Sequence, residues 1–247
     1  MDQIRGLQAN QDSVLEAPRI CLFMIVKDES KVIRRCLESV KPLVHSWVIV
    51  DTGSTDDTRS IIHEVMAGIP GALHDSKWVG FAHNRSESVR FAQVYESDYL
   101  FTLDADEWVT GDLSGLIKNG PNACSVYVDT GDGNPLPRTV LLKTGLPWSY
   151  RGRLHEIPVL LGQPVMSPIL EGLKIETRFE GSRHFKATEP MHDLMLMAQE
   201  VKDHPGDQFC IHALGRMLKA HGYDEMADQM FAHSKEYGAM IGYKESA

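Results

Sequence analysis

Tyr-Leu-Phe-Thr-Leu-Asp-Ala-Asp-Glu, residues 99–107, is a stretch in which an apolar run leads directly into three carboxylates. A short, continuous apolar run is typical of a strand that is buried on both faces of a parallel sheet. Asp104 then lies at the carboxyl end of this strand, where open α/β sheets bind their ligands. The stretch therefore predicts a parallel sheet with an acidic ligand site at one edge.

Two β-α units precede this stretch. The apolar run 20–26 predicts a first strand, and the helix after it has apolar side chains at helical spacing and Ser30 in position to cap it. The run 47–50 predicts a second strand that ends at Asp51, and apolar residues within 61–66 mark the next helix. Alternating strands and helices imply a parallel sheet that is covered on both faces.

A third helix is expected over residues 82–94, ahead of the strand at 99–103. Residues 111–168 are rich in Gly and Pro, and their pattern favours short antiparallel strands and loops, among them 124–128 and 139–142. The expected fold class is therefore α/β, with a Rossmann-like parallel sheet.

The C-terminal part is predicted to be helical, because its apolar residues recur at helical spacing. The helices are expected over residues 191–201, 209–220 and 224–233. The last two resemble one tetratricopeptide unit, which we expect to pack on the main domain, since a single unit cannot form a solenoid. The facing residues of this unit are Leu214, Met217, Leu218, Met226, Ala227, Met230 and Phe231. The chain is thus divided into a polar leader at 1–19, an α/β domain at 20–188 and a helical extension at 189–247.

The composition excludes some classes of protein. The 247-residue chain is 43% hydrophobic and has a formal net charge of -9, which argues against nonspecific nucleic-acid binding. The four cysteines lack C-x-x-C spacing, which indicates neither a zinc ribbon nor a disulfide framework and favours a reducing compartment. The longest apolar run, 21–26, is too short to span a bilayer. We therefore expect a soluble, cytoplasmic protein, either free or peripheral at the inner membrane face.

Asp104 and Asp106 form an acidic pair, followed at once by Glu107. Mn2+ and Mg2+ prefer oxygen ligands and can bridge a carboxylate to the phosphates of a nucleoside diphosphate. Such a short pattern also arises by chance as a solvated turn, but its place directly after an apolar strand favours a metal site. We predict Asp104 and Asp106 as metal ligands, with Mn2+ or Mg2+ as the cofactor.

Asp51 ends the second predicted strand and precedes the turn 52–55, whose amides and hydroxyls can approach a ligand closely. It lies too early to cap the next helix well, so we expect it to contact a nucleoside. Asp56 and Asp57 are better placed to cap that helix.

Two further groups of charged residues are candidates for the site. Arg85 is predicted to point toward the sheet, where it pairs with Asp104 or with a phosphate, and a plain structural ion pair is the alternative. In the segment 151–156, His155 is a candidate metal ligand and Glu156 a candidate general base for an acceptor hydroxyl. An ordinary salt bridge at a strand edge is the alternative for this segment.

The order of these motifs resembles that of the family 2 glycosyltransferases, which have a GT-A fold. The joint pattern covers about residues 20–157 and is far more specific than any one of its elements. The matching segments are residues 24–29, 48–56, 81–85, 103–107 and 154–156.

The resemblance implies a hexosyltransferase-like enzyme that moves a sugar from a UDP- or GDP-type nucleoside-diphosphate sugar to an acceptor hydroxyl, with inversion at the anomeric carbon. Cell-surface glycan or other glycoconjugate synthesis is the implied setting, with a glycan, a lipid-linked molecule, a protein or a modified nucleic acid as acceptor. By the resemblance, Lys27 and Glu29 line the nucleoside pocket, Asp51 meets the base, Arg85 and Asp104 hold the nucleotide, and Asp106 binds the cation.

One departure from the family pattern concerns the metal. Family members often have a His after an Ile near the end of the catalytic domain, but the matching stretch 175–178 has none. Either His184 substitutes for it, or the cation is held by fewer protein ligands. Two other classes stay open: a nucleotidyltransferase, and a catalytically degenerate interaction module that contacts a protein through its C-terminal helices.

Overall fold

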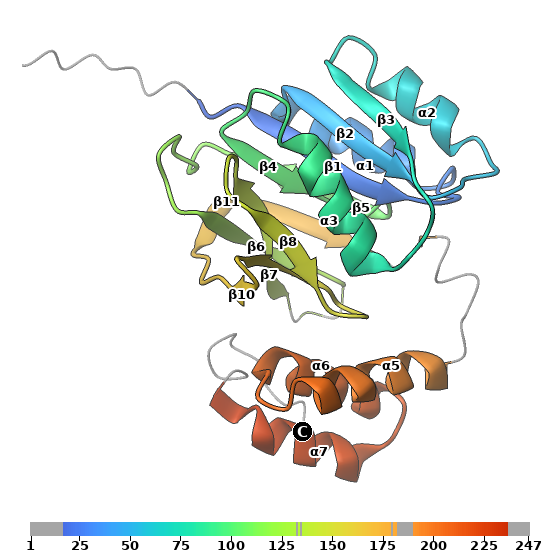
Figure 1. Ribbon diagram of the computed structural model, residues 1–247, viewed down its shortest axis with the longest axis vertical. Coiled ribbons are helices and arrows are strands. Elements are labelled where there is room, and N and C mark those ends of the chain that lie inside the picture. Colours follow the sequence, from blue (N-terminus) through green and yellow to red (C-terminus); the bar gives the residue numbers. More distant parts are fainter. Residues whose placement is uncertain (1–16, 132, 134, 179, 182–189, 237–247) are drawn as a thin grey trace, which may run out of the picture.

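The computed structural model describes residues 17–131, 133, 135–178, 180–181 and 190–236 of the chain. These residues form an eight-stranded sheet with helices on both faces, a three-stranded sheet beside it, and a group of C-terminal helices (Figure 1). The strands are β1 (Ile20–Val26), β2 (Ser46–Asp51), β3 (Gly71–Asp75), β4 (Tyr99–Thr102), β5 (Glu107–Gly111), β6 (Ala123–Asp129), β7 (Leu136–Lys143), β8 (Trp148–Arg151), β9 (Ile157–Leu160), β10 (Gln163–Pro164) and β11 (Ile169–Thr177). The helices are α1 (Ile33–Val40), η1 (Lys41–Leu43), α2 (Thr58–Val65), α3 (Phe81–Ala92), α5 (Pro190–Asp203), α6 (Gln208–Ala220) and α7 (Asp224–His233).

The large sheet has the strand order β3-β2-β1-β4-β7-β6-β11-β5. Its first four strands are parallel, and Val26 at the end of β1 lies opposite Asp51 at the end of β2. The turns after β1, β2 and β4 therefore share one edge of the sheet, and Asp104 follows β4 at that edge. The predicted α/β fold with a parallel sheet is confirmed in this half. Strands β2 and β3 are added on one side of β1, and β4 is added on its other side. In α/β sheets, ligands bind in the crevice at such a reversal of strand order, which here lies between β1 and β4.

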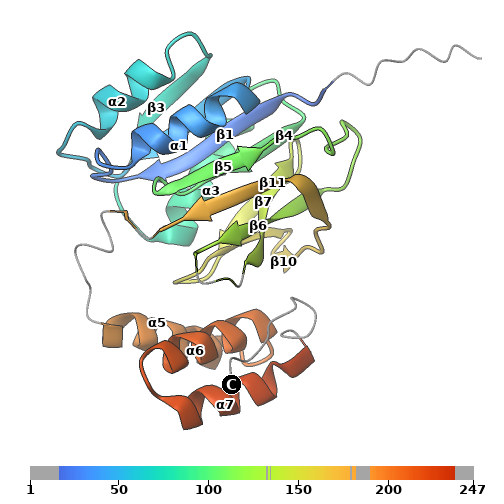
Figure 2. The same cartoon turned by 180° about the vertical axis from the view of Figure 1, so that it is seen from behind.

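Strand β1 is buried on both of its faces, and the two faces contribute to different apolar clusters. Leu22 and Met24 belong to the cluster under α1 and α2, whereas Cys21 and Phe23 belong to the cluster under α3 and β8. Helix α1 lies on the face of the large sheet that is turned to the viewer in Figure 2, and α3 lies on the opposite face, which is turned to the viewer in Figure 1. Successive side chains of β1 thus alternate between the two clusters. A strand between two helical layers needs apolar side chains on both faces, which explains the continuous apolar run.

Two details of the parallel half differ from the sequence prediction. Strand β3 is not predicted, because Gly71–Asp75 is a half-exposed edge strand that lacks an apolar run. Ser30 does not cap α1, which begins at Ile33 with Val32 in the cap position. The amide of Ser30 instead donates to Asp56 Oδ2 at 3.0 Å, because the turns after β1 and β2 bond to each other.

The second half of the sheet is mixed. β6 and β7 pair antiparallel, which confirms the predicted antiparallel strands in this region. β11 lies between β6 and β5, and its last residue, Thr177, is opposite Glu107. The sequence predicts neither β5 nor β11, yet their pairing brings the end of β11 back to the acidic turn after β4.

The C-terminal helices have an apolar cluster of their own. Leu194 and Met197 of α5 pack with Leu214 and Leu218 of α6, and α7 adds Phe231. Helix α5 is therefore part of the same small core as the predicted helical pair. Met226, which we expect in the interface of that pair, is instead 54% exposed, because α7 turns its neighbour Ala227 inward.

Ion pairs connect these helices to the end of β8 and to the turn after it. Arg151 pairs with Asp207, and Arg153 Nη1 lies 3.1 Å from Glu200 Oε2 and 2.8 Å from Asp203 Oδ2. The expectation that the helices pack on the main domain is thus met by charged contacts among the residues described. Among the helices described, none has both the length and the hydrophobicity that a membrane span requires.

The stability of the helical part is expected to depend on pH through His212. This side chain is 3% exposed and packs on Phe231, and burial, helped by Arg216, lowers its pKa to about 4. A lowered pKa means that the unfolded chain binds the proton more tightly, so stability is complete above pH 6.5 and is lost as the pH falls toward 4. The full loss is about 3 kcal/mol at 1.36 kcal/mol per pKa unit.

Urea unfolding of the wild type and of His212→Leu between pH 7 and 5, followed by helical circular dichroism, tests this dependence. The wild type should lose more stability than the variant over this interval. Parallel curves for the two proteins would contradict the assigned role of His212.

Candidate active site

The turns after β1 and β2 are held together by hydrogen bonds at the edge of the sheet. The amide of Asp28 donates to Ser54 Oγ at 2.9 Å, and Asp28 Oδ1 accepts from the amide of Thr55 at 2.8 Å. Asp28 has a left-handed φ of 55° and Gly53 one of 107°, so both turns bend sharply where the strands end. The result is a rigid two-turn platform beside Asp104.

Asp51 is built into this platform. Its Oδ1 accepts the amides of Gly53 (2.8 Å) and Ser54 (2.7 Å), and its Oδ2 lies 3.0 Å from Arg59 Nη1. The side chain of Asp51 has no solvent exposure. The carboxylate therefore shapes the turn in this structure, and its predicted contact with a nucleoside base stays a prediction.

The platform also positions the other residues predicted at this edge. Lys27 is exposed and Glu29 half-buried, and the amide of Glu29 donates to Thr58 Oγ1 at 2.7 Å. Of the two predicted helix caps, Asp56 accepts the amide of Thr58 at 3.0 Å, whereas Asp57 makes no side-chain cap bond.

Arg85 joins three elements at the edge of the sheet. Its Nη2 lies 2.6 Å from Asp104 Oδ1, its Nε lies 2.6 Å from Glu156 Oε1, and its Nη1 donates to Thr102 Oγ1 at 3.0 Å. The side chain is only 8% exposed, as the inward orientation predicts. Burial opposes its charge, but Asp104 and Glu156 outweigh burial and raise the pKa of Arg85 well above its usual value. The predicted pairing with Asp104 is confirmed.

A second arginine, Arg138 of β7, holds the same acidic turn from the other side. It makes a two-point contact with Glu107, at 2.7 Å from Nη1 and 2.5 Å from Nη2, and its Nη1 lies 3.4 Å from Asp104 Oδ2. Glu107 Oε2 also accepts the amide of Asp104 at 2.8 Å. Burial raises the pKa of Glu107, although Arg138 acts to lower it. Sequence reasoning missed Arg138, because nothing near it in the chain indicates that β7 pairs with β4.

Asp106 faces a different direction from Asp104. Its Oδ2 accepts the amide of Gly181, beyond the end of β11, at 3.1 Å. A side chain at Gly181 would begin 3.2 Å from this oxygen and 3.5 Å from Glu29 Oε2, so the two carboxylates approach one place. Arg35 of α1 fixes the same corner, because its Nη2 donates to the carbonyl of Asp106 (3.3 Å) and lies 2.6 Å from Glu180 Oε2.

Tyr150 of β8 closes the site beneath Arg85. The guanidinium carbon of Arg85 lies 5.7 Å from the centre of the Tyr150 ring, and the tyrosine is 8% exposed. Burial raises the pKa of Tyr150, so its hydroxyl stays protonated at neutral pH. The ring therefore gives Arg85 an apolar floor that favours ion pairing over hydration.

The turn at residues 152–156 brings Glu156 to Arg85, the partner of Asp104. Glu156 is 10% exposed and paired with Arg85, whereas His155 is exposed and has a left-handed φ of 55°. In the described ranges, no three His, Cys, Asp or Glu side chains come together as a metal site, so the predicted set of Asp104, Asp106 and His155 is not preassembled. The individual ligand assignments stay predictions. His184, the alternative ligand, lies outside the described residues.

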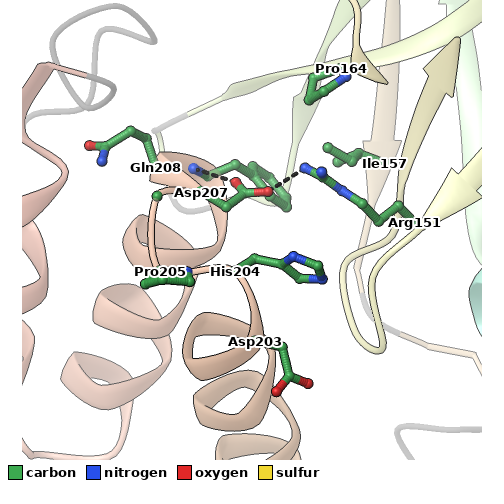
Figure 3. A pocket seen from close by; sticks show the side chains of 10 residues that line it. Arg151, Ile157, Pro164, Asp203, His204, Pro205, Asp207 and Gln208 are labelled. Atoms are coloured by element: carbon green, nitrogen blue, oxygen red, sulfur yellow. Dashed lines mark hydrogen bonds and ion pairs between the residues drawn. The ribbon is translucent and has the colours of Figure 1, made fainter. Parts of the chain in front are cut away.

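A separate hollow of about 590 Å3 lies between the small sheet and the C-terminal helices. Arg151 reaches Asp207 beside it, and Ile157 and Pro164 form its sheet side (Figure 3). Arg151 and Ile157 are the immediate neighbours of Tyr150 and Glu156. Because side chains alternate along a strand, Arg151 points to the opposite side of β8 from Tyr150, and the hollow lies on the side of Arg151.

The family model for glycosyl transferase family 2 matches residues 21–153, which is more than half of the chain. This protein belongs to glycosyl transferase family 2. The match includes the platform, Arg85, the acidic turn and Arg138, and family membership together with the sheet order identifies the fold as GT-A.

Individual relatives match this chain either at low identity or over a limited part of its length. The SPbeta prophage-derived glycosyltransferase SunS of Bacillus subtilis is 23% identical over 224 residues, which are 86% of this chain and 52% of SunS. A TPR repeat-containing protein of Synechococcus elongatus is 37% identical over 89 residues, 36% of this chain and 21% of that protein. Among solved structures, S. aureus TarS 1-349 in complex with UDP-GlcNAc has a TM-score of 0.48 at 14% identity, covering 92% of this chain and 76% of that one. The chain thus spans about a fifth to a half of these curated relatives.

Loss of Arg138 is expected to destabilise the acidic turn. Arg138→Met leaves the carboxylate of Glu107, which is 3% exposed, without its cation. Because Arg138 itself is 36% exposed, we expect a loss of roughly 2 to 3 kcal/mol at pH 7, below the loss of about 3 to 5 typical of fully buried pairs. Without Arg138, burial acts on Glu107 unopposed and raises the pKa of this carboxyl further. A carboxyl with a raised folded pKa contributes stability that is present below its unfolded pKa and is lost as the pH rises, so the deficit of the variant should shrink at acidic pH.

Urea unfolding of Arg138→Met and Arg138→Met/Glu107→Gln at pH 7 and pH 5 measures this effect. The second substitution should recover part of the stability, because it removes the uncompensated charge. Equal stability of the two variants at both pH values would show that the ion pair does not hold the turn.

Proposed function

We propose that this protein is a metal-dependent, inverting glycosyltransferase that moves a sugar from a UDP- or GDP-type donor to an acceptor hydroxyl. The observation that carries the proposal is the arrangement at the end of β4. Asp104 is fixed between Arg85 and Arg138 at the ligand edge of a family 2 fold, and Asp106 faces a second carboxylate, Glu29.

The charges of the site support a cation as cofactor. Three arginines, Arg35, Arg85 and Arg138, lie at this edge and are outnumbered by its carboxylates, so the edge is acidic and would repel a diphosphate. These carboxylates are Asp104, Asp106, Glu107, Glu156 and Glu180. A divalent cation supplies the missing positive charge at the departing diphosphate.

The oxygen donors fit Mn2+ or Mg2+. These ions are commonly held by one or two protein carboxylates, with waters and substrate phosphates completing the coordination. Asp106 and Glu29 are the carboxylates that approach one place, whereas both oxygens of Asp104 lie against arginines. We assign Asp106 as the principal ligand, with His155 retained only as a candidate that would have to move.

The remaining residues bind and orient the donor in this proposal. The platform of Asp28, Asp51 and Gly53 supports the nucleoside, with Lys27 exposed beside it. Arg85 and Asp104 hold the nucleotide together, and their ion pair fixes the position of the Asp104 carboxylate. We further propose that residues 20–188 form the transferase domain and 189–247 an extension, and that a glycan, a lipid-linked molecule, a protein or a modified nucleic acid is the acceptor.

Donor binding is tested by thermal unfolding with UDP or GDP, each with and without Mn2+. A ligand at about 100 times its Kd stabilises the native state by about 2.7 kcal/mol, which raises Tm by roughly 5 °C or more in a chain of this size. Asp106→Ala should abolish the part of the shift that requires Mn2+. Asp228→Ala, which removes an exposed carboxylate of α7, is the matched control and should behave like the wild type. A wild-type protein that neither nucleotide stabilises would refute the proposal.

The role of Glu156 is tested by Glu156→Gln once a donor and an acceptor are identified. As general base, Glu156 removes the acceptor proton, and its loss should lower kcat by about 100-fold or more while Kd for the donor is unchanged. The pairing with Arg85 at 2.6 Å suggests the competing role of positioning that arginine. In that case Kd for the donor rises and kcat changes little, which would exclude Glu156 as the base.

A further inference from the structure

The loop between β3 and α3, residues 76–80, is attached at both ends to the candidate donor site. At its start, the amide of Ser76 donates to the carbonyl of Asp51 at 2.9 Å. At its end, the loop leads into α3, the helix that carries Arg85. The loop therefore runs between the residue predicted to meet the base and the residue predicted to hold the nucleotide.

Asn84 fixes the course of this loop. Its side chain is fully buried, and its Oδ1 accepts the amides of Val79 (2.9 Å) and Gly80 (3.2 Å). Its Nδ2 donates to the carbonyl of Lys77 at 2.9 Å and to Ser76 Oγ at 3.4 Å. One buried amide thus satisfies four polar groups of the loop, which gives the loop a defined conformation without a strand or helix.

This ordered loop presents an indole to solvent. Trp78 is 45% exposed, although a tryptophan normally buries most of its large apolar surface. Its ring packs edge-on against Phe81, with centroids 4.7 Å apart and planes at 82°, so the orientation of the indole is supported. Trp47 and Trp148 are buried, and Trp108 lies against Arg35 and Arg178. Trp78 is therefore the tryptophan that the fold exposes beside the ligand edge.

We propose that Trp78 stacks on the nucleobase of the donor, an inference that rests on the proposed function. The base needs a recognition surface on this side of the site, because the carboxylate of Asp51 is fully covered and already accepts two amides and an arginine. Every nucleobase has a flat face that an aromatic ring can cover, and such stacking does not depend on the identity of the base. The starting point of the loop at Asp51 favours the base over the sugar or the acceptor as the group that Trp78 contacts.

The test compares three ligands, each with Mn2+, on the full chain: UDP, GDP and inorganic pyrophosphate, which lacks a base. Trp78→Ala should weaken the binding of the preferred nucleotide by about tenfold and leave pyrophosphate binding unchanged. Trp78→Phe keeps an aromatic face and should retain most of the affinity. Val79→Ala, at a 65% exposed apolar position of the same loop, is the matched control and should bind like the wild type.

Tryptophan fluorescence gives a second readout. The nucleotide should quench the emission of the wild type, and Trp78→Phe should lose most of that quenching while still binding the nucleotide. Unchanged nucleotide affinity in Trp78→Ala would overturn the inference, as would an equal loss of nucleotide and pyrophosphate binding. If Trp78→Ala changed only the KM for the acceptor, the indole would contact the acceptor and the inference would also be wrong. Failure of the wild type to bind either nucleotide would instead refute the proposed function.

Discussion

The site depends on the position of one carboxylate, Asp104, between two arginines, one from a helix that covers the sheet and one from a strand within it. Arg85 reaches it from α3 and Arg138 from β7, while Glu107 accepts its amide and pairs with Arg138. A charge pair this close to the interior is stable only if each partner is held in place, because burial penalises any ion left alone. The helix α3, the strand β7 and the turn after β4 must therefore be positioned together before the edge can bind anything.

The parallel half of this fold, except for the half-exposed edge strand β3, could be predicted from the sequence. The apolar runs of β1, β2 and β4 are continuous, and each is followed by a polar turn, so both the strands and the ligand edge are apparent from local residue patterns. The pairing of Arg85 with Asp104 was also within reach, because helical spacing sets the direction of Arg85 and fold rules place Asp104. Local periodicity and one topological rule suffice for this part.

Other parts of the site could not be predicted, because they depend on contacts between distant residues. Arg138 faces Glu107 only because β7 pairs with β4, and Gly181 reaches Asp106 only because β11 pairs with β5. Neither strand pairing can be recognised from the residues next to Arg138 or Gly181 in the sequence. Asp51 shows a different limit: its residue type and place suggest a ligand contact, whereas in the structure its carboxylate accepts the amides of the turn, so the contact with a nucleoside stays a prediction. Residue type and position alone cannot distinguish these two uses.

The sheet and the C-terminal helices each have apolar interiors of their own, and the contacts described between them are pairs such as Arg151 with Asp207. A replacement inside one interior leaves no void in the other. Substitutions can therefore alter the helices, or the helices can be exchanged for another appendage, while the half with the parallel strands keeps its sequence. Such modularity allows a family 2 domain to diversify through changes in the helices that contact the end of β8.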